Sequence, residues 1–400
     1  MLHSYKFKMP IEYNDYRKLS KHVKTDMELD GSDNIINHLF PDSSNNSLLK
    51  NKWSSLYSVD KKYIKDNQVF LKKYKGIKNN IHSFMNEYIE YKSEQNFVSK
   101  YQYIQFKRFF YLNSITGFLQ LLAMYNFCTP LMSLLSPIFG LIIPYFVLYF
   151  KGIKLSFINY IKVLKKIILS NNMIGGMLNF QKRTFQQNMY TMVTIFFYCM
   201  SIYNNITSCI QFYKNTNYIL SFIDKYDTFI KQGDKLIDTI YKSTKKLNKF
   251  KEFNTNMISY KDKIKKMKEQ MNLIVSQKEK SLKYGQIGLI LKCNYEFFYN
   301  DTYHDTIMYL IYLNQFNNNI CCLRTCIKDK KINKCSFLKN EKVKPKIKNM
   351  YYLPHINNDT NIKNDILLKK NLIITGPNAS GKTTLLKTSL YNLFLSQSIG

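Results

Sequence analysis

Residues 372–390 read LIITGPNASGKTTLLKTSL, and this stretch decides the fold class of the C-terminal part of the chain. The β-branched run Leu372–Thr375 predicts a short buried strand. Gly376–Thr383 matches the pattern G-x-x-x-x-G-K-[ST] without a mismatch. Apolar residues then recur at helical spacing, at Leu385, Leu386, Leu390, Leu393 and Phe394. The order strand, glycine-rich loop and helix is that of a P-loop.

The residue types in this loop fit the binding of a triphosphate. Gly376 and Gly381 permit a backbone path in which successive N–H groups face one anion, and the helix N-terminus adds its positive dipole end. Lys382 would place its charge on the β- and γ-phosphates, and Thr383 would offer its hydroxyl to Mg²⁺. We therefore predict binding of ATP with Mg²⁺, with Ser380 and Thr384 acting through their N–H groups. The predicted site comprises Gly376, Pro377, Asn378, Ala379, Ser380, Gly381, Lys382, Thr383 and Thr384.

No catalytic residue can be named from the sequence. P-loop enzymes hold magnesium and position water with an acidic residue at the end of a second strand, well beyond the loop. The sequence given stops at Gly400, shortly after Thr383. We expect weak ATP binding and no turnover, as for a truncated chain or one part of a split enzyme, so whether it is an enzyme stays open.

The charge balance points to polyanions. The formal net charge is +32, from 59 Lys+Arg against 27 Asp+Glu, which suits nucleic acid or an anionic membrane surface. A coding bias towards Asn, Lys, Ile and Tyr explains the same excess equally well. Base reading favours arginine, and the chain has only four arginines, Arg17, Arg108, Arg183 and Arg324. Contacts to DNA would therefore be mainly to its backbone.

The sequence divides into four predicted regions. Residues 1–106 are polar and partly helical, 107–152 form a hydrophobic helical segment, 153–340 form a helical core with long, lever-like helices, and 341–400 begin a P-loop ATPase domain. The first 20 residues are polar, with no secretory signal. A reducing cytoplasmic or nuclear-type compartment with free thiols is therefore expected. The fold class is mainly α with a C-terminal α/β start.

Residues 109–150 carry no charge. As helix they would extend roughly 63 Å, about twice the ~30 Å of a hydrocarbon core. One interpretation is a transmembrane hairpin that turns near Thr129-Pro130, with basic residues keeping both flanks cytosolic. The alternative is a buried helical pair in a soluble core. A second uncharged stretch, residues 184–213, is more typical of a core helix than of a span.

Long helices are expected over residues 219–284. The sequence there has a heptad seam, which consists of Phe253, Met257, Tyr260, Ile264, Met267, Met271 and Ile274. This seam indicates either an arm that transmits motion or one packed helix pair with a solvated lysine face. A further apolar helical pattern covers residues 285–316. Residues 317–350 are expected to be mostly loop and short strands, and 350–354 a strand.

The loop resembles those of MutS-type and ABC-type ATPases, at Gly376–Asn378 and Gly381–Thr384. Its neighbours are closer to the MutS family, the DNA mismatch repair ATPases. Asn364-Asp365-Ile366 is similar to the Asn-Asp-Ile that precedes the MutS loop, and Gln397–Gly400 is similar to the Gln-Ile-Gly that closes its helix. The resemblance covers residues 345–400. It implies a DNA-associated clamp whose helical arms respond to ATP and which dimerises through its ATPase domains.

The chain also departs from that family. Asn361-Ile362-Lys363 replaces the Phe-Val-Pro step, which removes the aromatic residue that stacks on adenine, and Ala379-Ser380 replaces Met-Gly. The Phe250-Lys251-Glu252 match to the mismatch wedge lies within the helical arm, so mismatch recognition does not follow. Two alternatives stay open: an ABC-type transporter half, which would have about six spans, and a non-enzymatic, membrane-tethered helical protein.

Overall fold

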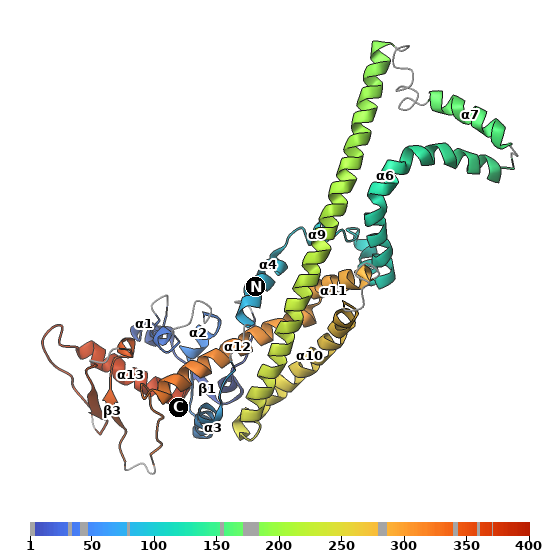
Figure 1. Cartoon of the computed structure of the whole chain (residues 1–400). Coiled ribbons are helices and arrows are strands. Elements are labelled where there is room, and N and C mark those ends of the chain that lie inside the picture. The colour runs from blue at the N-terminus through green and yellow to red at the C-terminus, as the bar shows by residue number, and fades with distance from the viewer. Residues whose placement is uncertain are drawn as a thin grey trace. The chain divides into compact units, whose positions relative to one another are not determined.

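The computed structural model describes residues 5–30, 34–40, 47–77, 81–152, 156–170, 184–278, 286–338, 343–357, 361–369 and 371–400. The chain forms two compact units. Unit 1 combines Met1–Lys92, Lys225–Met271 and Asn300–Gly400, and unit 2 combines Ser93–Asp224 and Asn272–Tyr299. Helices dominate both units and the strands are short, which confirms the mainly α prediction (Figure 1).

The central helix of unit 1 is α12 (Asp301–Lys328). Asn300 caps its N-terminus by accepting the N–H of Thr302 at 2.9 Å. Every residue from 306 to 317 is buried, as expected of a helix surrounded by its neighbours. This helix also corrects the prediction that residues 317–350 are mostly loop, because the helix continues to Lys328.

An aromatic cluster joins α12 to the elements around it. The ring of Phe316 stacks on Trp53 of α2 (Ser47–Trp53) and on Phe70 of α3 (Lys61–Lys73), with 6.2 Å between centroids in each pair. Phe253 of α10 (Lys251–Lys278) lies 5.9 Å from the same ring. These contacts bring residues from three distant parts of the sequence into one core.

The predicted heptad seam is confirmed as the buried face of α10. Its seam residues Phe253, Met257, Ile264, Met267 and Met271 are at most 1% exposed. The Tyr260 ring stacks on Tyr309 of α12 at 3.7 Å. Lysines outside the seam pair with the C-terminal part of α9 (Phe185–Thr244), where Lys261 contacts Asp238 and Lys268 contacts Asp234. Within unit 1, α10 is therefore a packed helix with a charged outer face.

Short elements complete unit 1. Its N-terminal part contains η2 (Pro10–Tyr13), β1 (Tyr16–Lys18), α1 (Lys21–Asp26), η3 (Ile35–His38), β2 (Leu56–Ser58) and α4 (Ile81–Ser93). β1 and β2 pair antiparallel, as do β3 (Lys346–Met350) and β4 (Asn364–Leu367). The strand predicted at 350–354 is displaced: β3 ends at Met350, and Pro354 lies in the 3₁₀ turn η7 (Leu353–His355), because proline supplies no N–H to a ladder.

Unit 2 contains α5 (Phe97–Lys100), η4 (Lys107–Ser114), α6 (Thr116–Phe150), α7 (Phe157–Ser170), the first part of α9 and α11 (Ile287–Tyr299). The start of α6 packs on α11 at Gly288. A Cβ atom added there would lie 2.4 Å from the Thr116 carbonyl oxygen and 2.6 Å from the Gln120 nitrogen. The Gly288 N–H donates to Gln120 Oε1 at 2.8 Å. Glycine is therefore required for this close approach of two helices.

The predicted hairpin at Thr129-Pro130 is wrong, because α6 continues through both residues as one helix. Proline removes the N–H that the Asn126 carbonyl would otherwise accept. The Thr129 hydroxyl donates to that carbonyl at 2.8 Å and replaces the lost bond. Figure 1 shows that α6 bends along its length, as helices do at internal prolines.

Residues 184–213 are not a buried core helix, which corrects that prediction. Large apolar side chains of α9 such as Phe196 and Phe197 are 60% and 65% exposed. By length and composition alone, two helices are apolar enough to cross a membrane, Thr116–Gly140 and Phe185–Thr244. In the most apolar 18-residue window of each, 11% and 0% of the residues are buried.

Candidate nucleotide-binding loop

The loop before α13 (Lys382–Ser398) follows a backbone path suited to an anion. Ala379 has φ +62° and Gly381 has φ +84°, whereas Ser380 between them is not in the positive-φ region. Such alternation turns consecutive N–H groups towards one side and forms a concave nest. Gly381 is also the N-cap of α13, so the nest opens at the N-terminus of a 17-residue helix. The predicted helix is thus confirmed, and it begins where the pattern places it.

Lys382 lies across this loop. Its ammonium group donates to the Gly376 carbonyl and, at 3.0 Å, to the Pro377 carbonyl. The charge is thereby held beside the loop rather than extended into solvent. It adds to the positive end of the α13 dipole, and both favour a negatively charged ligand.

The loop is compact at Gly376. A Cβ atom there would lie 2.9 Å from the Ser380 hydroxyl oxygen, so a larger side chain would displace Ser380. The Ser380 N–H reaches the Pro377 carbonyl at 3.4 Å. Residues 371–381, which include Asn378, are exposed, as are Thr383 and Thr384. The structure therefore brings all the predicted site residues together on one accessible loop and the first turn of α13.

Leu372–Thr375 does not form the predicted strand. The segment has no strand structure, and Ile373 is 90% exposed. A buried P-loop strand needs neighbouring parallel strands to accept its hydrogen bonds. The sheets in the described part of the chain are two antiparallel pairs, and neither includes this segment. The segment leads into the loop without regular secondary structure, and the described residues do not show a P-loop domain around it.

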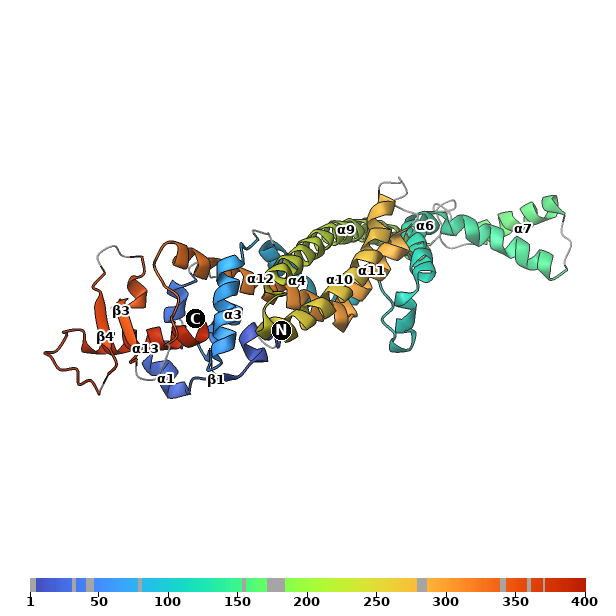
Figure 2. The ribbon, with the colours of Figure 1, turned by 90° about the horizontal axis from the view of Figure 1, so that it is seen from below.

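The apolar residues of the α13 pattern are only partly buried. Leu386, Leu390 and Leu393 are 40–53% exposed and share one face of the helix. The buried face instead consists of Thr388, Ser389, Tyr391, Phe394 and Ser398. This face packs on β2 and on β3. Figure 2 shows α13 beside β3. The leucines of the pattern thus mark an uncovered face beside the loop.

Residues far from the motif fix the orientation of α13. The Tyr391 hydroxyl donates to the Met27 carbonyl at 2.6 Å. Glu28 accepts from Lys387 at 2.6 Å and from the Tyr352 hydroxyl at 2.8 Å. Hydrogen bonds from Lys387 and then Tyr352 lower the pKa of Glu28. Sequence reasoning missed Glu28, because no local pattern links residue 28 to residue 387.

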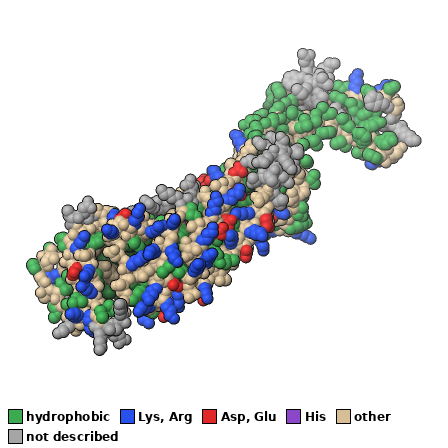
Figure 3. All heavy atoms as spheres, turned by 60° about the horizontal axis from the view of Figure 1, so that its bottom comes forward, with side chains coloured by type: hydrophobic (Ala, Val, Ile, Leu, Met, Phe, Trp, Pro, Cys, Tyr) green, Lys and Arg blue, Asp and Glu red, His purple; other side chains and the backbone are tan. Residues whose placement is uncertain are grey.

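A second charged feature of unit 1 is the exposed side of α3. We call it the α3 basic face, and it consists of Lys61, Lys62, Lys65, Lys72, Lys73, Lys334 and Phe337. The Phe337 ring lies 5.3 Å from Lys61 Nζ and 5.8 Å from Lys65 Nζ. Figure 3 shows blue Lys and Arg side chains densely placed over this part of the molecule.

Lys334 lies on the α3 basic face within reach of the charge of Lys72. Its ammonium donates to the Gln68 carbonyl at 3.1 Å. Burial, and then repulsion from Lys72, lower the pKa of Lys334. An arriving anion would relieve that repulsion, so the face is electrostatically prepared for a polyanion.

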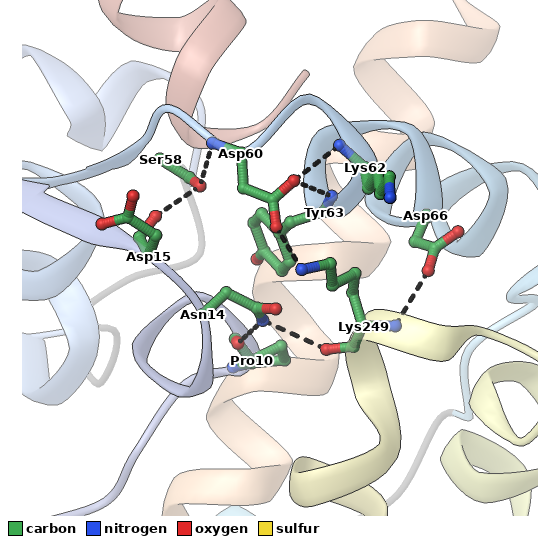
Figure 4. A network of polar contacts seen from close by, with 9 residues as sticks. All are labelled: Pro10, Asn14, Asp15, Ser58, Asp60, Lys62, Tyr63, Asp66 and Lys249. Carbon is green, nitrogen blue, oxygen red and sulfur yellow. Dashed lines mark hydrogen bonds and ion pairs between the residues drawn. The ribbon is translucent and has the colours of Figure 1, made fainter.

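The start of α3 is fixed by a polar network around Asp60 (Figure 4). Asp60 accepts the N–H groups of Lys62 and Tyr63 at 2.8 and 3.3 Å, and its other oxygen pairs with Lys249 Nζ at 2.5 Å. Burial opposes ionisation of Asp60, but these hydrogen bonds outweigh it and lower its pKa. Asp66 accepts the Lys249 N–H at 3.0 Å. The network locks the turn between α9 and α10 onto α3, so the basic face is rigidly presented.

Comparison with protein-family models, with curated proteins and with solved structures finds no match for this chain.

Proposed function

We propose that residues 376–384 bind the phosphates of a nucleoside triphosphate, ATP, together with Mg²⁺. The observation that carries this proposal is the positive φ of Ala379 and Gly381 at the start of α13, with Lys382 held beside them. Amide N–H groups would bind the phosphate oxygens, and Lys382 would exchange its two carbonyl acceptors for the β- and γ-phosphates. Thr383 would contribute its hydroxyl to the Mg²⁺ that bridges those phosphates.

The test is calorimetric titration of the purified chain with Mg·ATP. Lys382→Ala should weaken binding at least tenfold, about 1.4 kcal/mol or more, because it removes the charge that faces the phosphates. Lys387→Ala is the matched control, since that lysine lies on the same helix but pairs with Glu28. Wild-type protein that gives no heat with millimolar Mg·ATP, or equal affinity for both variants, would refute the proposal.

A second proposal concerns DNA, which we place on the α3 basic face. Its lysines and the aromatic Phe337 together favour phosphate contacts without base reading. This supports a DNA-associated, MutS-like ATPase in which unit 1 carries both the loop and the DNA contact. The transporter alternative has less support, because it requires about six spans and the described residues contain two candidate helices.

Fluorescence anisotropy with a labelled duplex at several salt concentrations tests this second proposal. Replacing Lys62, Lys65 and Lys72 by Glu should reduce affinity at low salt by more than tenfold and lower the salt slope by up to about 3, since each phosphate contact contributes ~0.9. Lys235→Glu with Lys265→Glu is the control, because both lysines are exposed elsewhere in unit 1. If duplex DNA does not bind at low salt, or if the control loses as much affinity per charge, this assignment fails.

A further inference from the structure

The first half of α9 has the surface of a helix in an apolar solvent. No charged residue occurs from Phe185 to Tyr213, a length of about 43 Å at ~1.5 Å per residue. Its large apolar side chains are exposed, and they include Met189, Met192, Val193, Phe196, Phe197, Tyr203, Ile206 and Ile210. Helices on the surface of soluble proteins bury such residues against a core.

The partner of this helix within unit 2 is α6, and it is equally apolar on its outer side. The rings of Phe127 and Phe212 lie 5.3 Å apart, and the Tyr198 hydroxyl donates to the Leu134 carbonyl at 3.1 Å, so the helices run antiparallel. Beyond Ala123, α6 exposes the apolar side chains of Leu131, Met132, Leu134, Ile138, Ile142, Ile143, Phe146 and Val147. Figure 3 shows hydrophobic side chains gathered over the part of unit 2 formed by these helices.

At two of the three prolines of α6, a hydroxyl group satisfies the carbonyl that the proline leaves without a donor. Pro130 frees the carbonyl of Asn126, which accepts from Thr129 at 2.8 Å. Pro137 frees the carbonyl of Ser133, which accepts from Ser136 at 2.8 Å. In water such carbonyls are hydrated at little cost, whereas in hydrocarbon they need a partner within the protein. This arrangement therefore suits a helix from which water is excluded.

The helix α7, which follows α6, is amphipathic. Its lysines Lys162, Lys165 and Lys166 lie on the side turned away from Tyr160, together with Ile158, which is exposed. Tyr160 packs on Tyr145 of α6, with ring centroids 4.6 Å apart. Such basic amphipathic helices lie in the headgroup layer of anionic membranes, the charge typical of a cytoplasmic leaflet.

The uncovered apolar surface of α6 and α9 ends where buried residues begin on each helix. Leu119 and Ala123 are fully buried, because the first turns of α6 pack on α11. At the other end Lys214 closes the uncharged run of α9, and Phe212 is 1% exposed. The uncovered surface therefore belongs to α6 after Ala123 and to α9 before Phe212, and α7 lies between these two helices in the sequence.

We propose that this region is embedded in a lipid bilayer that contains anionic headgroups, with α6 and α9 in the hydrocarbon and α7 at its surface. The inference is independent of nucleotide binding, because every residue that carries it lies in unit 2. A second copy of the chain covering the same faces is the competing occupant, and the charge-free length of α9 together with the lysines of α7 favours an anionic bilayer over that copy.

Flotation of the full chain with vesicles of phosphatidylcholine and phosphatidylserine tests the proposal. Wild-type protein should float with the vesicles and resist washing with 1 M salt. Phe196→Lys with Phe197→Lys should reduce the salt-resistant fraction several-fold, because it places two charges in the hydrocarbon. Ile258→Lys is the control, since Ile258 is 42% exposed on α10 in unit 1 and should not affect flotation.

Fluorescence gives a readout that does not depend on loss of binding. The chain has one tryptophan, Trp53, which is buried in unit 1 and should not be quenched by brominated lipids. Phe197→Trp should add emission that shifts to the blue with vesicles and is quenched by those lipids. Emission that is unchanged by vesicles, together with failure to float, would overturn the proposal. Concentration-dependent oligomers that form without vesicle binding would assign the faces to a second copy instead.

Discussion

Substituting Gly381 by alanine tests whether the observed loop path is the one that binds phosphate. A Cβ atom at Gly381 would meet nothing within 4 Å, so the change adds no clash. The cost is conformational, because φ is +84° and an L-residue pays about 1–2 kcal/mol in that region. The loop is exposed and free to relax when no ligand is bound. The strain is then paid on binding, and we expect a 5- to 30-fold weaker affinity for Mg·ATP.

Ala379→Gly is the matched control for this prediction. Ala379 already has φ +62°, so glycine relieves about 1–2 kcal/mol of strain there and adds flexibility that costs about 0.5–1 kcal/mol; the variant should bind no more weakly than wild type. Calorimetric titration of both variants, with circular dichroism to confirm that α13 is intact, gives the comparison. If Gly381→Ala binds Mg·ATP as tightly as wild type, the observed path is not the binding path and the reasoning is refuted.

Three further predictions concern stability. Glu28→Gln should lower the free energy of unfolding by less than ~1 kcal/mol at pH 7, since the pair of Glu28 with Lys387 is partly exposed. That pair lowers the pKa of Glu28 in the folded protein, so its stabilisation is present above the unfolded pKa of about 4.3 and is lost as pH falls through the folded pKa. Urea melts of the wild-type and variant proteins should therefore converge in acid. Gly288→Ala should destabilise by about 1–3 kcal/mol in thermal melts through overlap with backbone atoms of α6, whereas Gly117→Ala, with open space around it, should not; equal effects would contradict the close approach. Met257→Ala should cost about 2–5 kcal/mol in denaturant melts, and a loss under 1 kcal/mol would argue against a buried seam.

Local chemistry was readable from the sequence where it depends on neighbouring residues. Gly381 is the N-cap of α13 and has a positive φ, which glycine adopts without strain, so the residue type alone predicts the turn from the loop into the helix. The seam of α10 follows from heptad spacing, which places Phe253, Met257 and Ile264 on one face whatever they pack against. The uncharged stretches were equally visible. Their helical structure was expected, but the exposed apolar side chains of residues 184–213 were not, because that stretch was predicted to be a core helix.

Properties that depend on distant segments were predicted less well. The carbonyl freed by Pro130 finds the Thr129 hydroxyl, so α6 continues where a turn was expected. The apolar pattern of α13 predicted a helix but not which of its residues are covered: Phe394 is buried with Tyr391 where β2 and β3 lie, whereas Leu386, Leu390 and Leu393 are exposed. Periodicity identifies the faces of a helix and does not say which of them meets a neighbour.

The sequence by itself determined the glycine-rich loop, the lysine beside it, the helix that follows and the apolar length of α6 and α9. These depend on backbone freedom, charge and side-chain spacing over a few turns of chain. Tertiary structure alone decided that residues 372–375 stay unpaired, that Glu28 contacts α13, and that residues 1–92 and 300–400 share unit 1. A strand or a buried face exists only when a distant segment supplies its hydrogen bonds or its cover, and no local pattern records that partner.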